Sequence, residues 1–313
     1  MSSQAVVKRA LITGASGLLG TALVSELHAT GQVDMTALSS RDVDLTNLDA
    51  TVAVFQTFRP DIVYHLAARV YGIMGNLRRQ GLSYYDNTRI NTNVIEASRL
   101  CGARKVVAMG SAAIYSDNVP LPMREEDIWL GPPHASEAGY AHAKRGMLAQ
   151  LAAYQDQYDL DYAYCVSTNL FGPNDKFDEE NGHVLPSLLS KFHRAIRDST
   201  DVVVWGTGKA TRDFLYSKDA ARAMRMAGER ISGPINLATG TAISIEEVVG
   251  ILQEVSGFSG RIVWDRNKPD GQKLRDYDIT KLRALEFKTE YSLREALAET
   301  YSWLTAHADT VRH

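Results

Sequence analysis

A tyrosine and a lysine four residues apart, Tyr140 and Lys144, are the first side chains in this sequence that could do chemistry together. Residues at positions i and i+4 lie on one face of a helix. A phenol is a poor acid or base near neutral pH, because its ordinary pKa is about 10, and we expect the nearby ammonium to lower that pKa. Such a pair can give a proton to a carbonyl oxygen or take one from an alcohol.

A third candidate, Ser111, follows the apolar run 105–109 and could hydrogen-bond the same substrate oxygen. Residues 109–116 read Met-Gly-Ser-Ala-Ala-Ile-Tyr-Ser, so the two positions after this serine carry only methyl groups. Because the tyrosine–lysine spacing occurs by chance in many helices, its meaning depends on the other motifs of the chain.

A glycine-bearing turn, Thr-Gly-Ala-Ser-Gly-Leu-Leu-Gly at 13–20, lies between a predicted strand over 7–13 and a helical pattern that starts at Leu18. Gly14 allows the tight turn, Gly17 lets the backbone approach a pyrophosphate, and Gly20 allows the helix to pack close to the sheet. The N–H groups at the helix start then bind the phosphates. In this strand–turn–helix context the motif predicts a dinucleotide site.

The end of the second predicted strand, Ala-Leu-Ser-Ser-Arg at 37–41, indicates which dinucleotide binds. An NAD enzyme places Asp or Glu there to hold the ribose 2′-hydroxyl. Two hydroxyls and the Arg41 guanidinium suit a 2′-phosphate instead, which favours NADP(H). The alternative is that Arg41 is a solvated surface charge. Asp44 and Leu45 would follow near the adenine.

Strands and helices alternate along the first half of the chain. Strands are predicted over 7–13, 35–38, 62–66, 106–109 and 162–166, and helices over 18–27, 49–58, 85–100 and 139–158. This alternation is typical of an α/β fold of Rossmann type, a doubly wound parallel sheet with right-handed crossovers.

The second half is less regular and predicts a smaller C-terminal α/β region that binds substrate. An irregular stretch over 167–186 precedes predicted helices over 186–198, 245–256 and 293–306 and strands over 202–205, 235–237 and 261–264. We expect an NADP-binding domain over 1–170 and a mainly substrate-binding region over 171–313. Because no linker separates them, the two should be interleaved.

Composition excludes several classes of protein. The 313 residues carry a net charge of −3, which gives no basic bias for nucleic acid. Cys101 and Cys165 lie in no metal-binding spacing, so no metal site is predicted, and this low usage fits a reducing compartment. No run has the form of a signal peptide or a membrane span. We therefore expect a cytoplasmic protein with no membrane contact.

Taken together, these motifs resemble the extended short-chain dehydrogenase/reductases. Within them, the chain looks like the branch of 3,5-epimerase-4-reductases that act on GDP-4-keto-6-deoxymannose. The stretches that carry this resemblance are 67–76, 167–173, 181–186, 202–208, 212–215 and 268–271. The resemblance implies NADP(H) as cofactor, a GDP-linked 4-keto-6-deoxysugar as substrate and a homodimer joined through the helices near 85–100 and 139–158.

The resemblance also implies roles for individual residues. Ser111, Tyr140 and Lys144 match the reductase triad, in which Tyr140 protonates O4 while hydride reaches C4 and Lys144 also holds the nicotinamide ribose. His183 matches a histidine that transfers protons during epimerisation, although a structural histidine is the alternative. Cofactor contacts are expected from Gly14, Ser16, Gly17, Leu18, Gly20, Arg41, Asp44, Leu45, Ala67, Tyr140, Lys144, Asn169 and His183. Substrate contacts are expected from Tyr71, Ala113, Asn169, Lys191, Trp205, Arg212, Arg261 and Asp270.

Two positions depart from that branch. Ala113 stands where the branch has a cysteine that serves as the second proton-transfer group, and Tyr71 stands where a glycine is usual. A methyl group cannot move a proton, and Cys165 is too far along the chain to replace the missing thiol. His142 follows Tyr140 by two positions and should face away from it.

Three hypotheses follow. The chain is an NADPH-dependent C4-ketoreductase with weak or absent 3,5-epimerase activity, a full 3,5-epimerase-4-reductase, or a non-catalytic NADP-binding protein that keeps the fold. The sugar itself stays open among a 6-deoxyhexose, a dideoxyhexose and a heptose.

Overall fold

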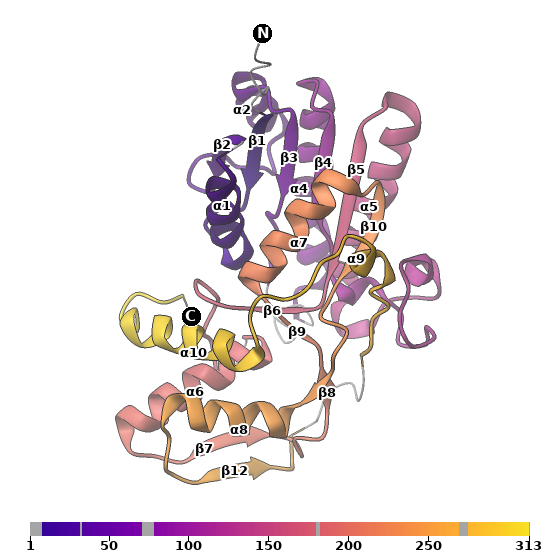
Figure 1. Cartoon of the computed structure of the whole chain (residues 1–313). Coiled ribbons are helices and arrows are strands. Elements are labelled where there is room, and N and C mark those ends of the chain that lie inside the picture. The colour runs from indigo at the N-terminus through magenta and orange to yellow at the C-terminus, as the bar shows by residue number, and fades with distance from the viewer. Residues whose placement is uncertain (1–7, 32, 71–77, 180–181, 269–274, 313) are drawn as a thin grey trace.

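A six-stranded parallel sheet forms the upper half of the computed structural model, which describes residues 8–31, 33–70, 78–179, 182–268 and 275–312 (Figure 1). In spatial order its strands are β10 (Gly233–Leu237), β5 (Asp161–Ser167), β4 (Lys105–Met109), β3 (Ile62–His65), β1 (Lys8–Thr13) and β2 (Val33–Leu38). The central strands are apolar on both faces, and Ile12, Val63 and Val107 are fully buried. Such continuous apolar strands are expected in a sheet that is covered on both sides.

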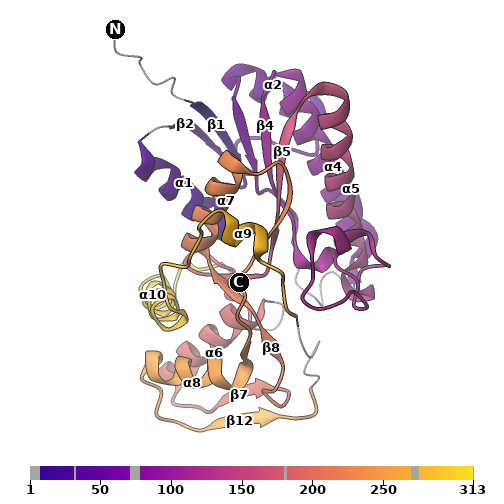
Figure 2. The same cartoon turned by 45° about the vertical axis from the view of Figure 1, so that its right-hand side comes forward.

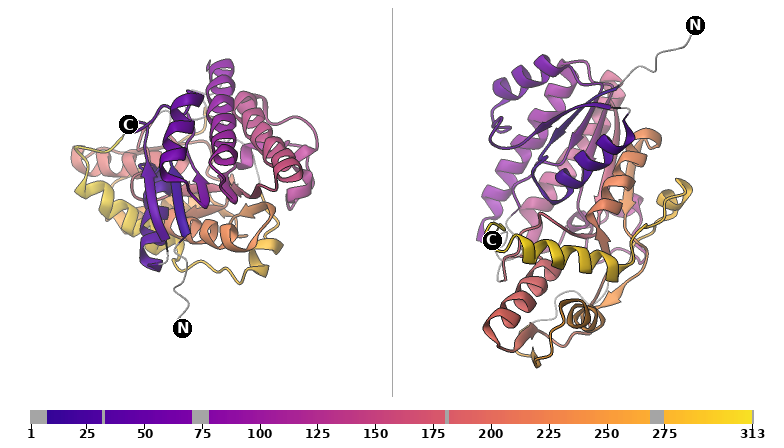
Figure 3. Two further views of the ribbon diagram at one scale, coloured as in Figure 1. Left: turned by 90° about the horizontal axis from the view of Figure 1, so that it is seen from above. Right: turned by 60° about the vertical axis from the view of Figure 1, so that its left-hand side comes forward.

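Helices cover both faces of this sheet (Figures 2 and 3). One set consists of α1 (Leu18–Thr30) and α7 (Ser217–Arg230), which pack against each other, and the other of α2 (Leu48–Phe58), α4 (Gln80–Leu100) and α5 (Ala138–Tyr158). Short 3₁₀ helices, η1 (Ala112–Ile114), η2 (Glu125–Trp129) and η3 (Ala135–Glu137), lie between β4 and α5. The predicted Rossmann-type fold is confirmed.

A second, smaller core lies at the lower end of the molecule (Figure 1). Its helices are α6 (Val184–Asp198), α8 (Ile245–Ser256) and α10 (Leu293–Ala306), which bury Phe192, Leu252 and Leu297. Its strands pair in twos: β6 (Asn169–Phe171) with β9 (Phe214–Tyr216), β7 (Val202–Trp205) with β12 (Ile262–Asp265), and β8 (Thr211–Arg212) with β11 (Ile243–Ser244). A short helix, α9 (Thr280–Ala284), packs against β10.

The main difference from the sequence-based expectation is α7, which was not predicted. Half of its buried residues are alanines, including Ala220, Ala223 and Ala227, and Met224 is its one large apolar buried side chain, so it lacks the run of large apolar residues from which the other helices were predicted. Both α7 and β10 come from beyond residue 170 yet pack in the upper half. The division into 1–170 and 171–313 stays a prediction.

The two longest helices, α4 and α5, lie side by side and have 21 residues each. Both contain charged and polar side chains throughout, and none of the described helices is long and apolar enough to cross a membrane. The homodimer expected through these helices stays a prediction.

A buried amide, Asn236 on β10, fixes the loop that follows β4. Its Oδ1 accepts a hydrogen bond of 2.7 Å from the Tyr115 hydroxyl, and its Nδ2 donates to the carbonyls of Met123 and Asp278 at 3.0 Å each. The Asn236 backbone N–H donates to Glu125 Oε1 at 2.8 Å. Because Tyr115 comes directly after η1, this amide holds the segment that carries Ser111.

We therefore predict that Asn236→Ala lowers the free energy of unfolding by about 2–3 kcal/mol, since it leaves the buried Tyr115 hydroxyl without its partner and removes the hydrogen bonds to the Met123 and Asp278 carbonyls. Urea denaturation measures the change. Tyr115→Phe, which removes only one of these bonds, should cost about 1 kcal/mol. An Asn236→Ala protein as stable as the wild type would show that this network contributes nothing.

Candidate active site

The predicted glycine turn lies where the strand order of the sheet reverses, between β1 and β3. Ligands of open α/β sheets bind at this point, outside the carboxyl ends of the strands. Gly14 has a φ of +72°, and a Cβ there would lie 2.8 Å from the backbone nitrogen of Ala67, which follows β3. A Cβ on Gly20 would lie 2.2 Å from the Gly14 carbonyl oxygen. Only glycine fits at both positions.

The start of α1 fits a pyrophosphate. Its N-cap is Gly17, which has no side chain to cap the helix, and the first turn contains no acidic residue. The N–H groups and the positive end of the helix dipole therefore remain available for an anion. Ser16 is exposed beside them, and Leu18 is half-buried.

The end of β2 differs in detail from the expectation of two hydroxyls for a 2′-phosphate. The Ser39 hydroxyl donates a hydrogen bond of 2.7 Å to Asp42 Oδ2, and the Ser39 backbone N–H does the same. These bonds lower the pKa of Asp42. Ser40 and Arg41 are exposed and remain the groups that can meet a phosphate. Asp44 accepts two hydrogen bonds from Thr46, and Leu45 is buried.

The structure brings Ser111, Tyr140 and Lys144 together at the carboxyl end of β4. Ser111 caps η1, where its Oγ accepts a hydrogen bond of 3.2 Å from the Ala113 N–H, and its side chain also hydrogen-bonds Tyr140. Lys144 Nζ lies 5.8 Å from the Tyr140 ring centre and donates a hydrogen bond of 2.7 Å to the Met109 carbonyl. The predicted one-face arrangement on α5 is present, and His142 is exposed on another face.

The expectation that Lys144 lowers the pKa of Tyr140 is wrong. Burial raises the pKa of Tyr140 well above its ordinary value, the Glu137 carboxylate raises it further, and the Ser111 hydrogen bond opposes them. Desolvation disfavours the phenolate more than the neighbouring groups stabilise it. Tyr140 is therefore a protonated phenol at neutral pH, which is the form that donates a proton.

The same burial acts in the opposite sense on Lys144, which is 1% exposed. Desolvation disfavours the ammonium and lowers the pKa of Lys144 to about 7.

His65 lies beneath Lys144 and is fully buried, with hydrogen bonds to Thr13 Oγ1 at 2.8 Å and Asn91 Oδ1 at 3.0 Å. Burial and then Lys144 lower the pKa of His65 to about 3, so its ring is neutral. Sequence reasoning missed this support, because nothing in the sequence shows that these residues meet.

Position 113 lies beside Tyr140. Ala113 is 4% exposed and packs in one apolar cluster with Tyr140, Ala141 and Ala68. Cys165 lies inside the sheet on β5, where burial raises the pKa of its thiol to about 12. That thiol keeps its proton at neutral pH, as expected of a core cysteine.

A second group of predicted residues gathers around Trp205 at the end of β7. The Trp205 side chain is 44% exposed, so it is not a core residue. Lys191 Nζ on α6 lies 4.9 Å from the indole ring centre, and Lys268 Nζ lies 5.0 Å from it. Lys268 was not among the predicted contacts, because only the pairing of β12 with β7 brings it close to Trp205. Two ammonium groups on one indole form a surface suited to an anionic, partly aromatic ligand.

Other predicted residues are more scattered. Arg212 on β8 is half-buried, and burial lowers its pKa, while Asn169 donates a hydrogen bond of 3.1 Å to the Asp213 carbonyl. His183 is the exposed N-cap of α6. Arg261 pairs with Asp201 at 2.6 Å, at the opposite end of the β7–β12 pair from Trp205, and so does not join that group. Tyr71 and Asp270 lie outside the described residues.

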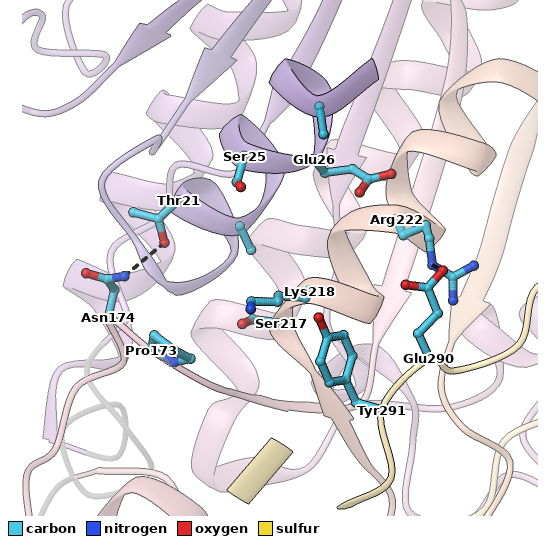
Figure 4. A pocket seen from close by; sticks show the side chains of 12 residues that line it. Thr21, Ser25, Glu26, Pro173, Asn174, Ser217, Lys218, Arg222, Glu290 and Tyr291 are labelled. Atoms are coloured by element: carbon cyan, nitrogen blue, oxygen red, sulfur yellow. Dashed lines mark hydrogen bonds and ion pairs between the residues drawn. The ribbon is translucent and has the colours of Figure 1, made fainter. Parts of the chain in front are cut away.

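A separate pocket opens between α1, α7 and the turn at 173–174 (Figure 4). Asn174 donates a hydrogen bond of 3.3 Å to Thr21 Oγ1 at one side, and Arg222 pairs with Glu290 at 3.1 Å at the other. Lys218 is paired with Glu299 at 2.5 Å. Because its charges are paired within the protein and none of the predicted site residues lines it, this pocket is distinct from the candidate active site.

Comparison with known proteins agrees with this geometry. The pattern that defines the NAD-dependent epimerase/dehydratase family matches residues 10–238. The chain belongs to this family. It is similar to "Probable GDP-L-fucose synthase 1" of rice, with 35% identity over 94% of this chain and 91% of the relative. It is also similar to the GDP-L-fucose synthase of Escherichia coli K12, with 34% identity over 97% of this chain and 99% of the relative.

Solved structures of the family superpose over nearly the whole chain. A GDP-L-fucose synthetase from Naegleria fowleri bound to NADP has 31% identity and a TM-score of 0.90, and covers 100% of this chain and 98% of its own. A GDP-6-OMe-4-keto-L-xylo-heptose reductase from C. jejuni has 27% identity and a TM-score of 0.88, and covers 96% of this chain and 98% of its own. The predicted resemblance is confirmed.

The lowered pKa of Lys144 predicts a stability change with pH. An unfolded lysine has a pKa near 10.5 and the folded one about 7, so the unfolded chain binds more protons between these values and the folded state gains stability as pH rises. From pH 7 to pH 9 this gain is about 2 kcal/mol. In Lys144→Met it should be absent, as measured by urea denaturation of both proteins at the two pH values. Equal gains in the two proteins would mean that Lys144 is not desolvated.

Proposed function

We propose that this protein is an NADPH-dependent reductase that converts the C4 ketone of a GDP-linked 4-keto-6-deoxysugar into an alcohol, with weak or absent 3,5-epimerase activity. The observation that carries the proposal is the neutral, buried Tyr140 in contact with Ser111 on one side and the methyl group of Ala113 on the other. This arrangement offers one proton donor for a ketone and no second proton-transfer group at position 113.

The reaction needs a hydride at C4 and a proton at the carbonyl oxygen. When bound at the glycine turn, NADPH supplies hydride to C4. The Ser111 hydroxyl orients the carbonyl oxygen, and Tyr140 donates its proton to that oxygen, so that an alcohol forms and Tyr140 becomes a phenolate. Lys144, with a pKa of about 7, stabilises this phenolate in its charged form. Solvent then returns a proton to Tyr140.

Epimerisation would make further demands on the site. A proton must leave C3 or C5 and return on the opposite face of the sugar, which requires two groups. His183 is the one candidate retained from the predicted pair, and it lies at the exposed start of α6. With a methyl group at position 113, the opposite face has no acid or base there.

The Trp205 group supports a nucleoside diphosphate as the remainder of the substrate. Lys191 and Lys268 flank the indole, and half-buried Arg212 lies on β8, the next strand along the chain after β7. Cations match the charge of a diphosphate, and an indole face suits a base or a sugar ring. Guanine is favoured by the relatives, whose names specify GDP-sugars.

A complete 3,5-epimerase-4-reductase, that is, a GDP-L-fucose synthase, is the second candidate. It is favoured by the names of the relatives at 34–35% identity and by the retention of His183. The structural similarity to a GDP-heptose reductase from C. jejuni favours the first. The two candidates differ in whether C3 and C5 exchange protons with water.

Deuterium incorporation distinguishes the two candidates. With GDP-4-keto-6-deoxymannose and NADPH in D₂O, we expect a reduced GDP-sugar whose C3 and C5 keep their hydrogen and their configuration. Ala113→Cys should raise exchange at one or both carbons by about 10²-fold or more, because it restores a proton-transfer group. Ala113→Ser, of similar size but without a readily ionised thiol, is the matched control. Rapid exchange at both carbons in the wild type would favour the complete epimerase-reductase.

The preference for NADPH over NADH tests whether Arg41 contacts the 2′-phosphate. Arg41→Ala should raise the KM for NADPH by about 10- to 100-fold and leave the KM for NADH unchanged, since one charge-assisted hydrogen bond to the 2′-phosphate is lost. Steady-state kinetics with both cofactors measures this. Arg104→Ala is the control, because Arg104 is exposed next to the opposite, amino-terminal end of β4. Equal effects on both cofactors would contradict a phosphate contact.

A further inference from the structure

The catalytic helix α5 begins without a cap of its own. Its N-cap residue, Glu137, makes no side-chain hydrogen bond to the helix, and no acidic residue stands in the first turn. The first N–H groups of a helix need partners from elsewhere, because they have none within the helix. Gly139 lies in this first turn, and Tyr140 follows it directly. The group that accepts hydrogen bonds from these N–H groups therefore also affects the position of the proton donor.

Gln80, the first residue of α4, supplies that partner. Its Oε1 accepts a hydrogen bond of 2.6 Å from the Gly139 N–H, and its Nε2 donates one of 2.7 Å to the Ala135 carbonyl. One side-chain amide thus joins η3 to the first turn of α5, across 55 to 59 residues of sequence. A cap from another helix fixes both the start of α5 and its position relative to α4.

Gly139 allows the starts of α4 and α5 to lie close together. A Cβ at Gly139 would lie 2.2 Å from the Gln80 carbonyl oxygen and 3.0 Å from its side-chain Oε1. The two helix starts therefore meet backbone to backbone, and a larger residue at position 139 would push them apart. The glycine and the amide together determine where α5 begins.

We infer that Gln80 is a positioning residue for Tyr140. It holds the first turn of α5 so that the phenol meets Ser111, whose own position is set by the end of β4. The bond to Gly139 is one residue from Tyr140, whereas Lys144 lies a full turn further along α5 and is held separately by the Met109 carbonyl. Gln80 therefore acts on proton donation and not on cofactor binding. This inference rests on the proposed reductase function.

The chain offers a matched control for this role. Gln150, also on the α4–α5 pair, donates a hydrogen bond of 3.4 Å from its side-chain amide to the Thr92 carbonyl. It joins the same two helices ten residues beyond Tyr140. Its removal perturbs helix packing without touching the start of α5.

The first test compares Gln80→Ala with Gln150→Ala in steady-state kinetics with NADPH and GDP-4-keto-6-deoxymannose. Gln80→Ala should lower kcat about tenfold, the effect of about 1.4 kcal/mol, and leave the KM for NADPH unchanged. Gln80→Glu keeps an acceptor for the Gly139 N–H and should restore kcat to within about threefold of the wild type. Gln150→Ala should behave as the wild type. Equal kcat values in Gln80→Ala and the wild type, or equal losses in both alanine variants, would overturn the inference.

Amide hydrogen exchange provides a readout that does not depend on the reaction. In Gln80→Ala, peptides that span 138–142 should exchange about tenfold faster than in the wild type, while Gln150→Ala and Gln80→Glu leave them protected. If the wild-type protein reduces no GDP-sugar, the proposed function fails, and the exchange result alone then decides whether Gln80 holds this turn. Unchanged exchange in Gln80→Ala would overturn its positioning role.

Discussion

Exclusion of water around Tyr140 and Lys144 is the constraint on which the chemistry of this site depends. One cause, burial, moves two pKa values in opposite directions: it raises the pKa of the Tyr140 phenol and lowers that of the Lys144 ammonium. Water is excluded where the end of β4 meets the first turns of α5, at the hydrogen bond that Lys144 Nζ donates to the Met109 carbonyl. A phenol that holds its proton at neutral pH suits reduction, where a proton must be given to the new alkoxide.

Such burial requires that backbones approach closely, and glycines make this approach available. Gly14 and Gly20 let the turn after β1 lie against Ala67 and against itself, and Gly139 lets α5 meet α4. The contacts of Gly14 with Ala67 and of Gly139 with Gln80 join segments that are far apart in sequence, and Gly14 also has a positive φ that strains other residues. The cofactor turn and the proton donor are thus positioned by the same device, with hydrogen bonds from side chains such as Gln80 fixing what the glycines permit.

The sequence allowed the fold, the glycine turn and the pairing of Tyr140 with Lys144 to be predicted, because each depends on local spacing or on alternation of strands and helices; the meeting of this pair with Ser111 was implied by the family resemblance. The direction of the Tyr140 pKa shift could not be predicted, since it depends on how much water the finished fold excludes. Helix α7 was not predicted because its buried face contains small residues and only one large apolar side chain, Met224. Lys268 and Gln80 act through partners distant in sequence, which no spacing shows.

Position 113 lies beside the side chain that donates the proton in the proposed reaction. In the proposed function, the missing proton-transfer group and the retained reduction are separable because they use different side chains around one ketone. The methyl group of Ala113 packs on Tyr140 together with Ala141 and Ala68. A polar or ionised group at that place would draw water toward the phenol and reduce the desolvation that raises its pKa. In the proposed function, the alanine therefore keeps the surroundings of Tyr140 dry and offers no second proton-transfer group.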